Sequence, residues 1–288
     1  MSHPIHKYSA LARPVEPKYP TNLAVVILLP LIAVGLFVWS LIGGAELSAA
    51  LPAGLLGALT AFLVWAMGRE MDPDHNATAF LAMALAVWAM VLGYGFDLLT
   101  LGALMFAVRL VNRTVGPPAK IGDIITLVLL NLGAVFVEGA WWMPFISVIA
   151  LVIDEAFERS NLTQRLAIPT LLALGIVAVF FGPGIDFSIL DTLVRGWIVT
   201  IIVLTILVSG TIFNSEDIRA SMDLLDAPCN SRRIQVGMAL ILLGALCSLL
   251  GGQESLAANL GILAVIAASL MGRNIVLGNE DKDETEAA

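Results

Sequence analysis

The feature that most constrains this chain is a succession of ten apolar stretches separated by short polar segments. A bilayer core of about 30 Å requires about 20 apolar residues per helical crossing, and at this hydropathy only helices satisfy their own backbone polar groups in lipid. Hydrophobic residues make up 59% of the 288 residues and charged residues 13%, a composition typical of chains embedded in a membrane. We therefore predict an all-α polytopic integral membrane protein with about ten transmembrane helices. The stretches cover Asn22–Ile42, Ala49–Met67, Ala77–Leu92, Gly95–Val111, Ile124–Val137, Trp141–Phe157, Leu166–Phe181, Thr192–Phe213, Ile234–Leu250 and Ser255–Met271.

The distribution of basic residues predicts the orientation of these helices. If the N-terminus is cytoplasmic, every lysine and arginine outside an apolar stretch falls on the cytoplasmic side, as the positive-inside rule expects. The opposite side carries acids instead, at Glu46, Glu138, Asp186 and Glu254, with Asp97 and Asp191 at the adjoining helix starts. We expect both termini in the cytoplasm, and an integral protein of a bacterial inner (plasma) membrane.

Three regions follow from the composition along the chain. Residues 1–21 form a basic, proline-containing arm that we expect to lie extended against the anionic cytoplasmic leaflet. Residues 22–277 form a single helical bundle, and residues 278–288 an acidic cytoplasmic tail. The cytoplasmic loop 214–233 is amphipathic, so we predict an interfacial helix that Asn214 caps and Pro228 ends.

The third to sixth stretches are short. About 16 residues at 1.5 Å each cover roughly 24 Å, less than the hydrocarbon core. They could therefore form two re-entrant hairpins, whose tips would bring Asp97 and Glu138 near the midplane. Aromatic residues at the two hairpin turns, Tyr94, Trp141 and Trp142, fit an interfacial belt and favour ten crossings.

Two groups of charged residues are candidates for substrate binding. Asp191 and Arg195 are four residues apart at the start of the eighth stretch, where an ion pair can lower the cost of an arginine in lipid. The pair could serve transport or lock two helices together. Arg109 and Arg113 share a helical face at the end of the fourth stretch, and Arg109 must reach the interface or meet an anion inside the bundle.

The second cytoplasmic turn carries an Asp-x-Asp pair, Asp72 and Asp74. Two carboxylates there could hold Mg²⁺ against a diphosphate, with Arg69 and His75 beside them. The same residues could instead form the turn and cap the third helix. Asp154 and Glu158 form a second acidic pair at the end of the sixth stretch, suited either to a cation or to a solvated helix end.

Three functional classes remain open. In length, crossing number and same-side termini the chain resembles ten-helix drug/metabolite transporters, which implies a small-molecule permease with alternating access and no cofactor. The first alternative is a cytoplasm-facing enzyme acting on a lipid diphosphate or headgroup, with Mg²⁺ at Asp72 and Asp74. The second is a non-catalytic membrane subunit or assembly factor that binds a protein at its cytoplasmic loops. The expected partners are the lipid bilayer and a small-molecule or lipid substrate, and no feature implies a nucleic acid.

Overall fold

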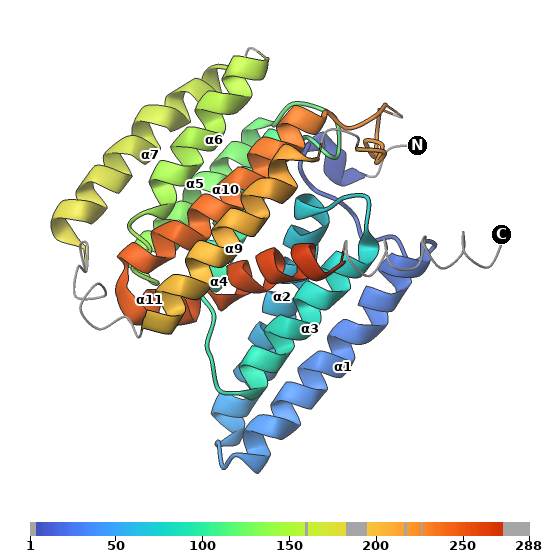
Figure 1. Ribbon diagram of the computed structural model, residues 1–288, viewed down its shortest axis with the longest axis vertical. Helices are drawn as coiled ribbons and strands as arrows, with labels where there is room; N and C mark the ends of the chain where they lie inside the picture. The colour runs from blue at the N-terminus through green and yellow to red at the C-terminus, as the bar shows by residue number, and fades with distance from the viewer. Residues whose placement is uncertain (1–3, 159–160, 183–194, 216–217, 226, 273–288) are drawn as a thin grey trace.

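The computed structural model describes residues 4–158, 161–182, 195–215, 218–225 and 227–272, and within these ranges all ten apolar stretches are helical (Figure 1). The described part contains no strand, only an isolated bridge between Ser221 and Pro228. The bounds of the helices differ from the predicted stretches mostly by a turn or less. The helices are α1 Pro20–Ile42, α2 Leu47–Met71, α3 Asn76–Val91, α4 Leu98–Asn112, α5 Ile121–Phe136, α6 Met143–Phe157, α7 Leu162–Phe181, α9 Arg195–Phe213, α10 Ser231–Leu250 and α11 Gly252–Ala258, followed by a helix over Leu260–Gly272, with the short 3-10 helix η1 at Pro4–Lys7.

Fewer than ten of these helices are long and apolar enough to cross a membrane. Four meet both conditions in the described part, namely α1, α2, α7 and α10. A fifth is possible if α11 and Leu260–Gly272, which meet at an angle of 57°, form one broken span. Helices α3 to α6 have only 15 or 16 residues each. These lengths fit an integral membrane protein and leave the crossing number at four to five by length alone.

The helices pack in two groups joined through α4 and α10 (Figure 1). In the first group α2 packs between α1 and α3. In the second, α6 contacts α4 and α7, and α5 contacts α4, α6 and α7. Helix α10 touches both groups, because it packs against α4, α2 and α6. The core is therefore built around α4 and α10.

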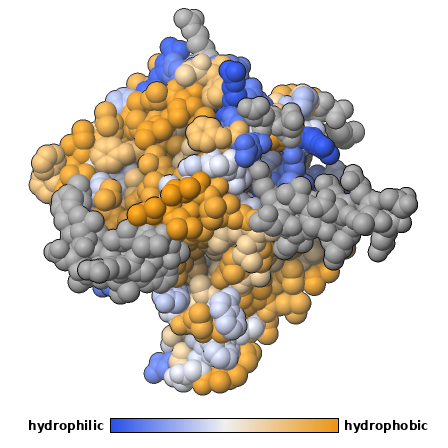
Figure 2. Space-filling view, viewed as in Figure 1, coloured by the Kyte–Doolittle hydropathy of each residue, from blue (hydrophilic) through white to orange (hydrophobic). Residues whose placement is uncertain are grey.

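The outer faces of the helices are apolar, as a lipid solvent requires. Large side chains lie exposed on several elements: Leu31 on α1 is 61% exposed, Leu129 on α5 61% and Phe180 on α7 77%. A water-soluble protein rarely exposes continuous apolar area of this extent. Figure 2 shows hydrophobic residues over much of the visible face and hydrophilic residues gathered near the end that holds the N-terminus.

The N-terminal arm folds back onto the bundle, contrary to the extended conformation that we predicted. Ala10 and Leu11 are buried, 1% and 2% exposed. Both donate their backbone N–H groups to the carboxylate of Asp123 near the start of α5, at 2.8 and 3.4 Å. Lys120 donates to the carbonyl of His6. Backbone donors that would otherwise face lipid headgroups or water are thus satisfied by the protein itself.

The predicted interfacial helix within 214–233 is wrong for its described part, because residues 218–225 are not helical. Their backbone groups bond elsewhere: the N–H of Asp223 donates to the carbonyl of Thr114, and that of Leu224 to Val115, each at 3.1 Å. Met222 bonds across the turn to Ala227 at 2.7 Å. Tertiary hydrogen bonds to the segment after α4 therefore decide the conformation of this loop, although its amphipathic sequence pattern favours a helix.

Candidate functional site

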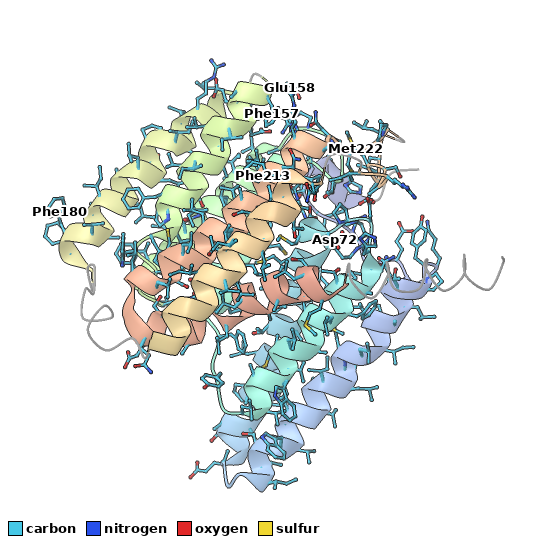
Figure 3. The ribbon with its side chains drawn as sticks, viewed as in Figure 1. Asp72, Phe157, Glu158, Phe180, Phe213 and Met222 are labelled. Carbon is cyan, nitrogen blue, oxygen red and sulfur yellow. The ribbon has the colours of Figure 1, made fainter. Side chains whose placement is uncertain are left out.

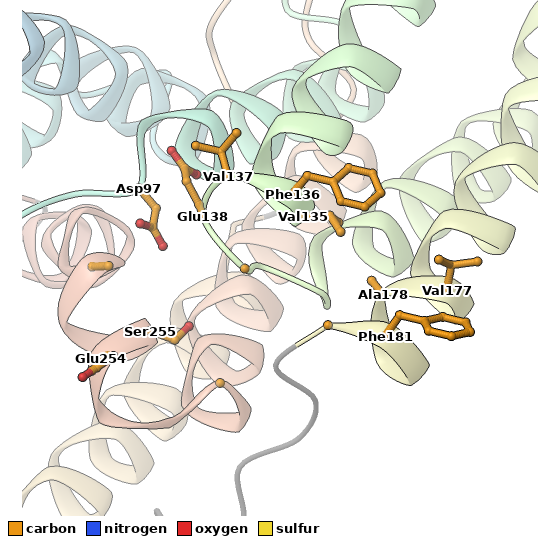
Figure 4. Close-up of a pocket in the computed structure, with 14 residues that line it drawn as sticks. Asp97, Val135, Phe136, Val137, Glu138, Val177, Ala178, Phe181, Glu254 and Ser255 are labelled. Atoms are coloured by element: carbon orange, nitrogen blue, oxygen red, sulfur yellow. The ribbon is translucent and has the colours of Figure 1, made fainter.

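A cavity of about 720 Å³ opens where the ends of α5 and α7 face α11, at the end of the bundle opposite the N-terminal arm. Three acids line it, Asp97, Glu138 and Glu254. Figure 4 shows Asp97 between the turn that carries Glu138 and the helix that carries Glu254 and Ser255. The remaining wall is largely apolar and comes from Val135–Val137, Gly139, Val177, Ala178, Phe181, Gly182, Gly251 and Ala258.

Glu138 is held in place by the first turn of α4. Its carboxylate accepts the backbone N–H groups of Leu99 and Thr100 and the Thr100 hydroxyl, each at 2.8 Å. A helix N-terminus favours a negative charge because its first amides have no partner within the helix. The turn between α5 and α6 therefore supplies a side-chain cap to α4, and this cap fixes one wall of the cavity.

Asp97, the residue before α4, meets a break in the last apolar segment. Its backbone N–H donates to the carbonyl of Ala258 at 2.9 Å, and its carboxylate accepts the Nδ2 group of Asn259 at 3.2 Å. Burial, followed by the charge of Glu138, raises the pKa of the Asp97 carboxyl to about 6. Asp97 can therefore change its charge near neutral pH.

Asn259 lies between α11 and the helix Leu260–Gly272, where the segment bends by 57°. The side chain is fully buried, and its Oδ1 atom has no hydrogen-bond partner in the described part of the chain. A buried amide oxygen without a partner costs about 1–3 kcal/mol. In many transporters the half-helix ends and the unwound backbone of broken helices form the ion and substrate sites.

The predicted pair of Asp191 and Arg195 cannot be placed in this cavity. Asp191 lies outside the described residues, and Arg195 begins α9 without a described side chain. The pair stays a prediction.

At the arm end of the bundle, Arg109 forms a buried ion pair with Glu70 of α2. Its Nε atom donates to the Glu70 carboxylate at 2.9 Å, and Glu70 is 0% exposed. Asn112 and the Thr114 hydroxyl also donate to this carboxylate, at 3.2 and 2.9 Å. Arg109 thus meets an anion inside the bundle, and that anion is a side chain of the protein.

Arg113 binds Asp154 of α6 in the same layer. Its Nε and Nη2 atoms donate to the two oxygens of this fully buried carboxylate, each at 3.0 Å. Arg233 of α10 donates to Asp154 at 2.6 Å and Gln164 of α7 at 3.0 Å. Glu158 adds an ion pair to Arg113 from its exposed position. Asp154 of α6 therefore links its own helix to α7, to α10 and to the C-terminal end of α4.

Asp72 and Asp74 are occupied by donors from the protein. Asp72 is 2% exposed and lies 2.9 Å from both the Thr78 hydroxyl and Nδ1 of His75. Asp74 accepts the backbone N–H groups of Arg219 and Ala220, the latter at 2.7 Å. These contacts fit the interpretation that Asp72 and Asp74 stabilise the turn between α2 and α3. Figure 3 shows Asp72, Glu158 and Met222 along this end of the bundle and Phe180 at the far end of α7.

From the sequence, Glu138 was expected at an external turn and Asp97 at a helix start, with both near the midplane only if the hairpins re-enter. No pattern brought them together with Asn259. One sequence feature could have indicated the broken helix: Gly251 and Gly252 precede an apolar segment that polar residues interrupt. Comparisons of the chain with protein-family models, with curated proteins and with solved structures find no match.

Proposed function

We propose that this protein is a small-molecule permease of a bacterial inner membrane, and that the acidic cavity receives its solute. The observation that carries the proposal is the cavity of about 720 Å³ whose acids lie beside a broken helix. The volume falls within the range of small-ligand sites, about 300–1,000 Å³. Three carboxylates and a mostly apolar wall favour a small solute with an ammonium or other cationic group.

The topology belongs to the same proposal. In this topology the chain starts in the cytoplasm and successive helices cross the membrane in alternating directions. This gives ten crossings, with both termini in the cytoplasm and the acidic cavity facing outward. Two findings support it: the ends of α2, α4 and α6 meet in one polar layer, and the start of α4 meets the turn after α5 at the opposite end. Crossings of 15 or 16 residues require local thinning of the bilayer.

In the proposed cycle Asp97 exchanges a proton for the cationic solute. With its pKa near 6, the carboxyl is largely ionised at neutral pH, so it attracts a cation from outside. Rocking of the α1–α3 group against the α4–α7 group then opens the loaded cavity to the cytoplasm. There a proton neutralises Asp97 and releases the solute, and the protonated carboxyl carries the proton outward on the return step.

The test is uptake by proteoliposomes. We expect the wild type to accumulate labelled methylammonium or choline, and Asp97→Asn to lose at least about 90% of the initial rate, because charge is removed while a polar side chain of the same size stays. Glu46→Gln is the matched control, since Glu46 is an exposed acid at the same end and outside the cavity. Equal uptake by the wild type and Asp97→Asn would contradict the proposal.

The same preparation distinguishes the two alternatives. Mg²⁺-dependent turnover of a lipid diphosphate that Asp72→Asn abolishes would favour the enzyme. A partner protein that co-purifies in stoichiometric amount, without uptake of methylammonium or choline, would favour the assembly subunit. The contacts of Asp72 and Asp74 give the enzyme no support, because protein donors occupy both carboxylates.

A further inference from the structure

A second cavity, of about 420 Å³, lies at the arm end of the bundle. Its walls come from five segments: the arm, the first turn of α1, the end of α2, the start of α3 and the loop after α9. The polar side chains among them include Arg13, Asn22, Arg69, Asn76 and Asp223. The proposed permease function assigns nothing to this place.

Arg69 differs from the other arginines buried in the bundle. Arg109, Arg113 and Arg233 each have a carboxylate oxygen within 3.0 Å. Arg69 has no acid within ion-pair distance in the described part of the chain. Its Nη1 atom donates to Asn22 Oδ1 at 3.4 Å, and its guanidinium lies 5.3 Å from the ring of Trp65. A partly buried guanidinium needs a counter-charge, so its positive charge is available to a ligand.

Of the other charged side chains around the cavity, Arg13 is paired with an acid, and the start of α1 adds the positive potential. Arg13 faces it from the arm, although Asp223 holds its Nη2 atom at 2.6 Å. Helix α1 begins at this wall with Pro20, and Tyr19 before it makes no side-chain cap. The first-turn amides and the helix dipole thus present a partial positive charge. Glu16 also lines the cavity and is paired with Lys18.

Helix α1, whose first turn lines the cavity, carries exposed apolar side chains next to that turn. Leu23 and Ile27, in the first two turns of α1, are 44% and 54% exposed. A small neighbouring cavity of about 30 Å³ shares Arg13, Asn22 and Arg69 with this one. Its other walls include the apolar side chains of Phe62, Trp65 and Met105. A polar headgroup in the larger cavity would therefore have apolar surface beside it for its chains.

We propose that this cavity binds an anionic phosphate group, with Arg69 as the main ligand and Arg13 and the start of α1 as support. Arginine suits phosphate because its planar fork donates two parallel charge-assisted hydrogen bonds. The exposed apolar face of α1 points to an anionic phospholipid headgroup as the source. Free phosphate presents the same chemistry, so the experiment distinguishes the two.

The experiment measures the melting temperature of detergent-purified full-length protein with dihexanoyl phosphatidylglycerol, with inorganic phosphate, or with sodium chloride at equal ionic strength. A ligand that binds only the folded state raises the melting temperature. We expect phosphatidylglycerol to stabilise the wild type and Arg69→Gln to weaken its apparent affinity at least about tenfold. Arg165→Gln is the matched control, because Arg165 lies at the same end, half exposed and paired with Glu155.

Each outcome decides something. Stabilisation by the lipid alone assigns a headgroup site, whereas equal stabilisation by inorganic phosphate assigns a site for free phosphate. No stabilisation by either, or the same shift in Arg69→Gln as in the wild type, overturns the proposal. If Arg69→Gln does not fold, Arg13→Gln serves as the second variant, with native mass spectrometry of the wild type counting bound phospholipid. Because these readouts do not depend on uptake, failure of the permease proposal leaves this one standing.

Discussion

Replacement of Asp154 by asparagine should destabilise the protein more than any other single change of charge at the arm end. The substitution keeps the size of the side chain and removes its charge. Arg113 and Arg233, only 5% and 7% exposed, would then lose the carboxylate that both share. Breaking a buried ion pair by removal of one partner costs about 3–5 kcal/mol when the other charge stays buried without compensation. Arg233 is left so in the described part of the chain, whereas Arg113 keeps its contact with Glu158.

The expected loss is large enough to measure by thermal unfolding in mild detergent, followed by tryptophan fluorescence. At about 2–4 °C per kcal/mol, Asp154→Asn should lower the melting temperature by about 6–20 °C. Glu158→Gln is the control, because Glu158 contacts the same Arg113 but is 60% exposed at its side chain. An exposed pair is worth at most about 1 kcal/mol, so its shift should stay under about 4 °C.

A double-mutant cycle tests the physical reason. Removal of Arg233 by substitution with methionine should cost much less in the Asp154→Asn background than in the wild type, because the uncompensated charge disappears with it. Additive losses would show that Asp154 does not act through Arg233. A melting temperature for Asp154→Asn within about 2 °C of the wild type would refute the whole account of the layer.

Three further changes test other parts of the structure. Because the pKa of Asp97 lies at about 6 in the folded protein and at 3.8 ordinarily, the folded state binds more protons between these values, so stability falls as pH rises through that window. After a discount for partial exposure the fall is about 1 kcal/mol, and Asp97→Asn should flatten the curve of melting temperature from pH 4 to pH 7; an unchanged slope contradicts the assignment. Burial raises the pKa of the Cys229 thiol to about 11, so in a Cys247→Ser background maleimide at pH 7.5 should label it slowly until the protein is denatured, and rapid labelling of the folded protein would show that the thiol is accessible. Asp123→Ala should release the arm and speed tryptic cleavage after Lys7 about 10- to 100-fold, because at least two charge-assisted hydrogen bonds to the arm are lost; unchanged cleavage would place the arm's anchor elsewhere.

The helices could be predicted from the sequence because hydropathy and length are local properties. The first predicted stretch, Asn22–Ile42, differs from α1 by two residues, and Trp141–Phe157 differs from α6 by two. The break at Asn259 was missed. Asn259 contacts Asp97, 162 residues earlier, and the local pattern of glycines and polar residues does not show that pairing.

The partners of the charged residues could not be predicted for the same reason. Arg109 was expected to meet an anion or the interface, yet its partner Glu70 lies 39 residues before it. Arg233 and Asp154 are 79 residues apart. Which carboxylate meets which arginine depends on the packing of α2, α4, α6 and α10, and the helical period fixes only the face on which each residue lies.

The docking of the N-terminal arm has a consequence for biosynthesis. The arm is synthesised before the helices that hold it, and Asp123, which accepts its backbone N–H groups, is made 113 residues after Ala10. Until α5 has been synthesised, the arm therefore lacks these hydrogen bonds and is more accessible to proteases and targeting factors. Protection of Lys7 from trypsin during translation would mark the moment when the first five helices have come together.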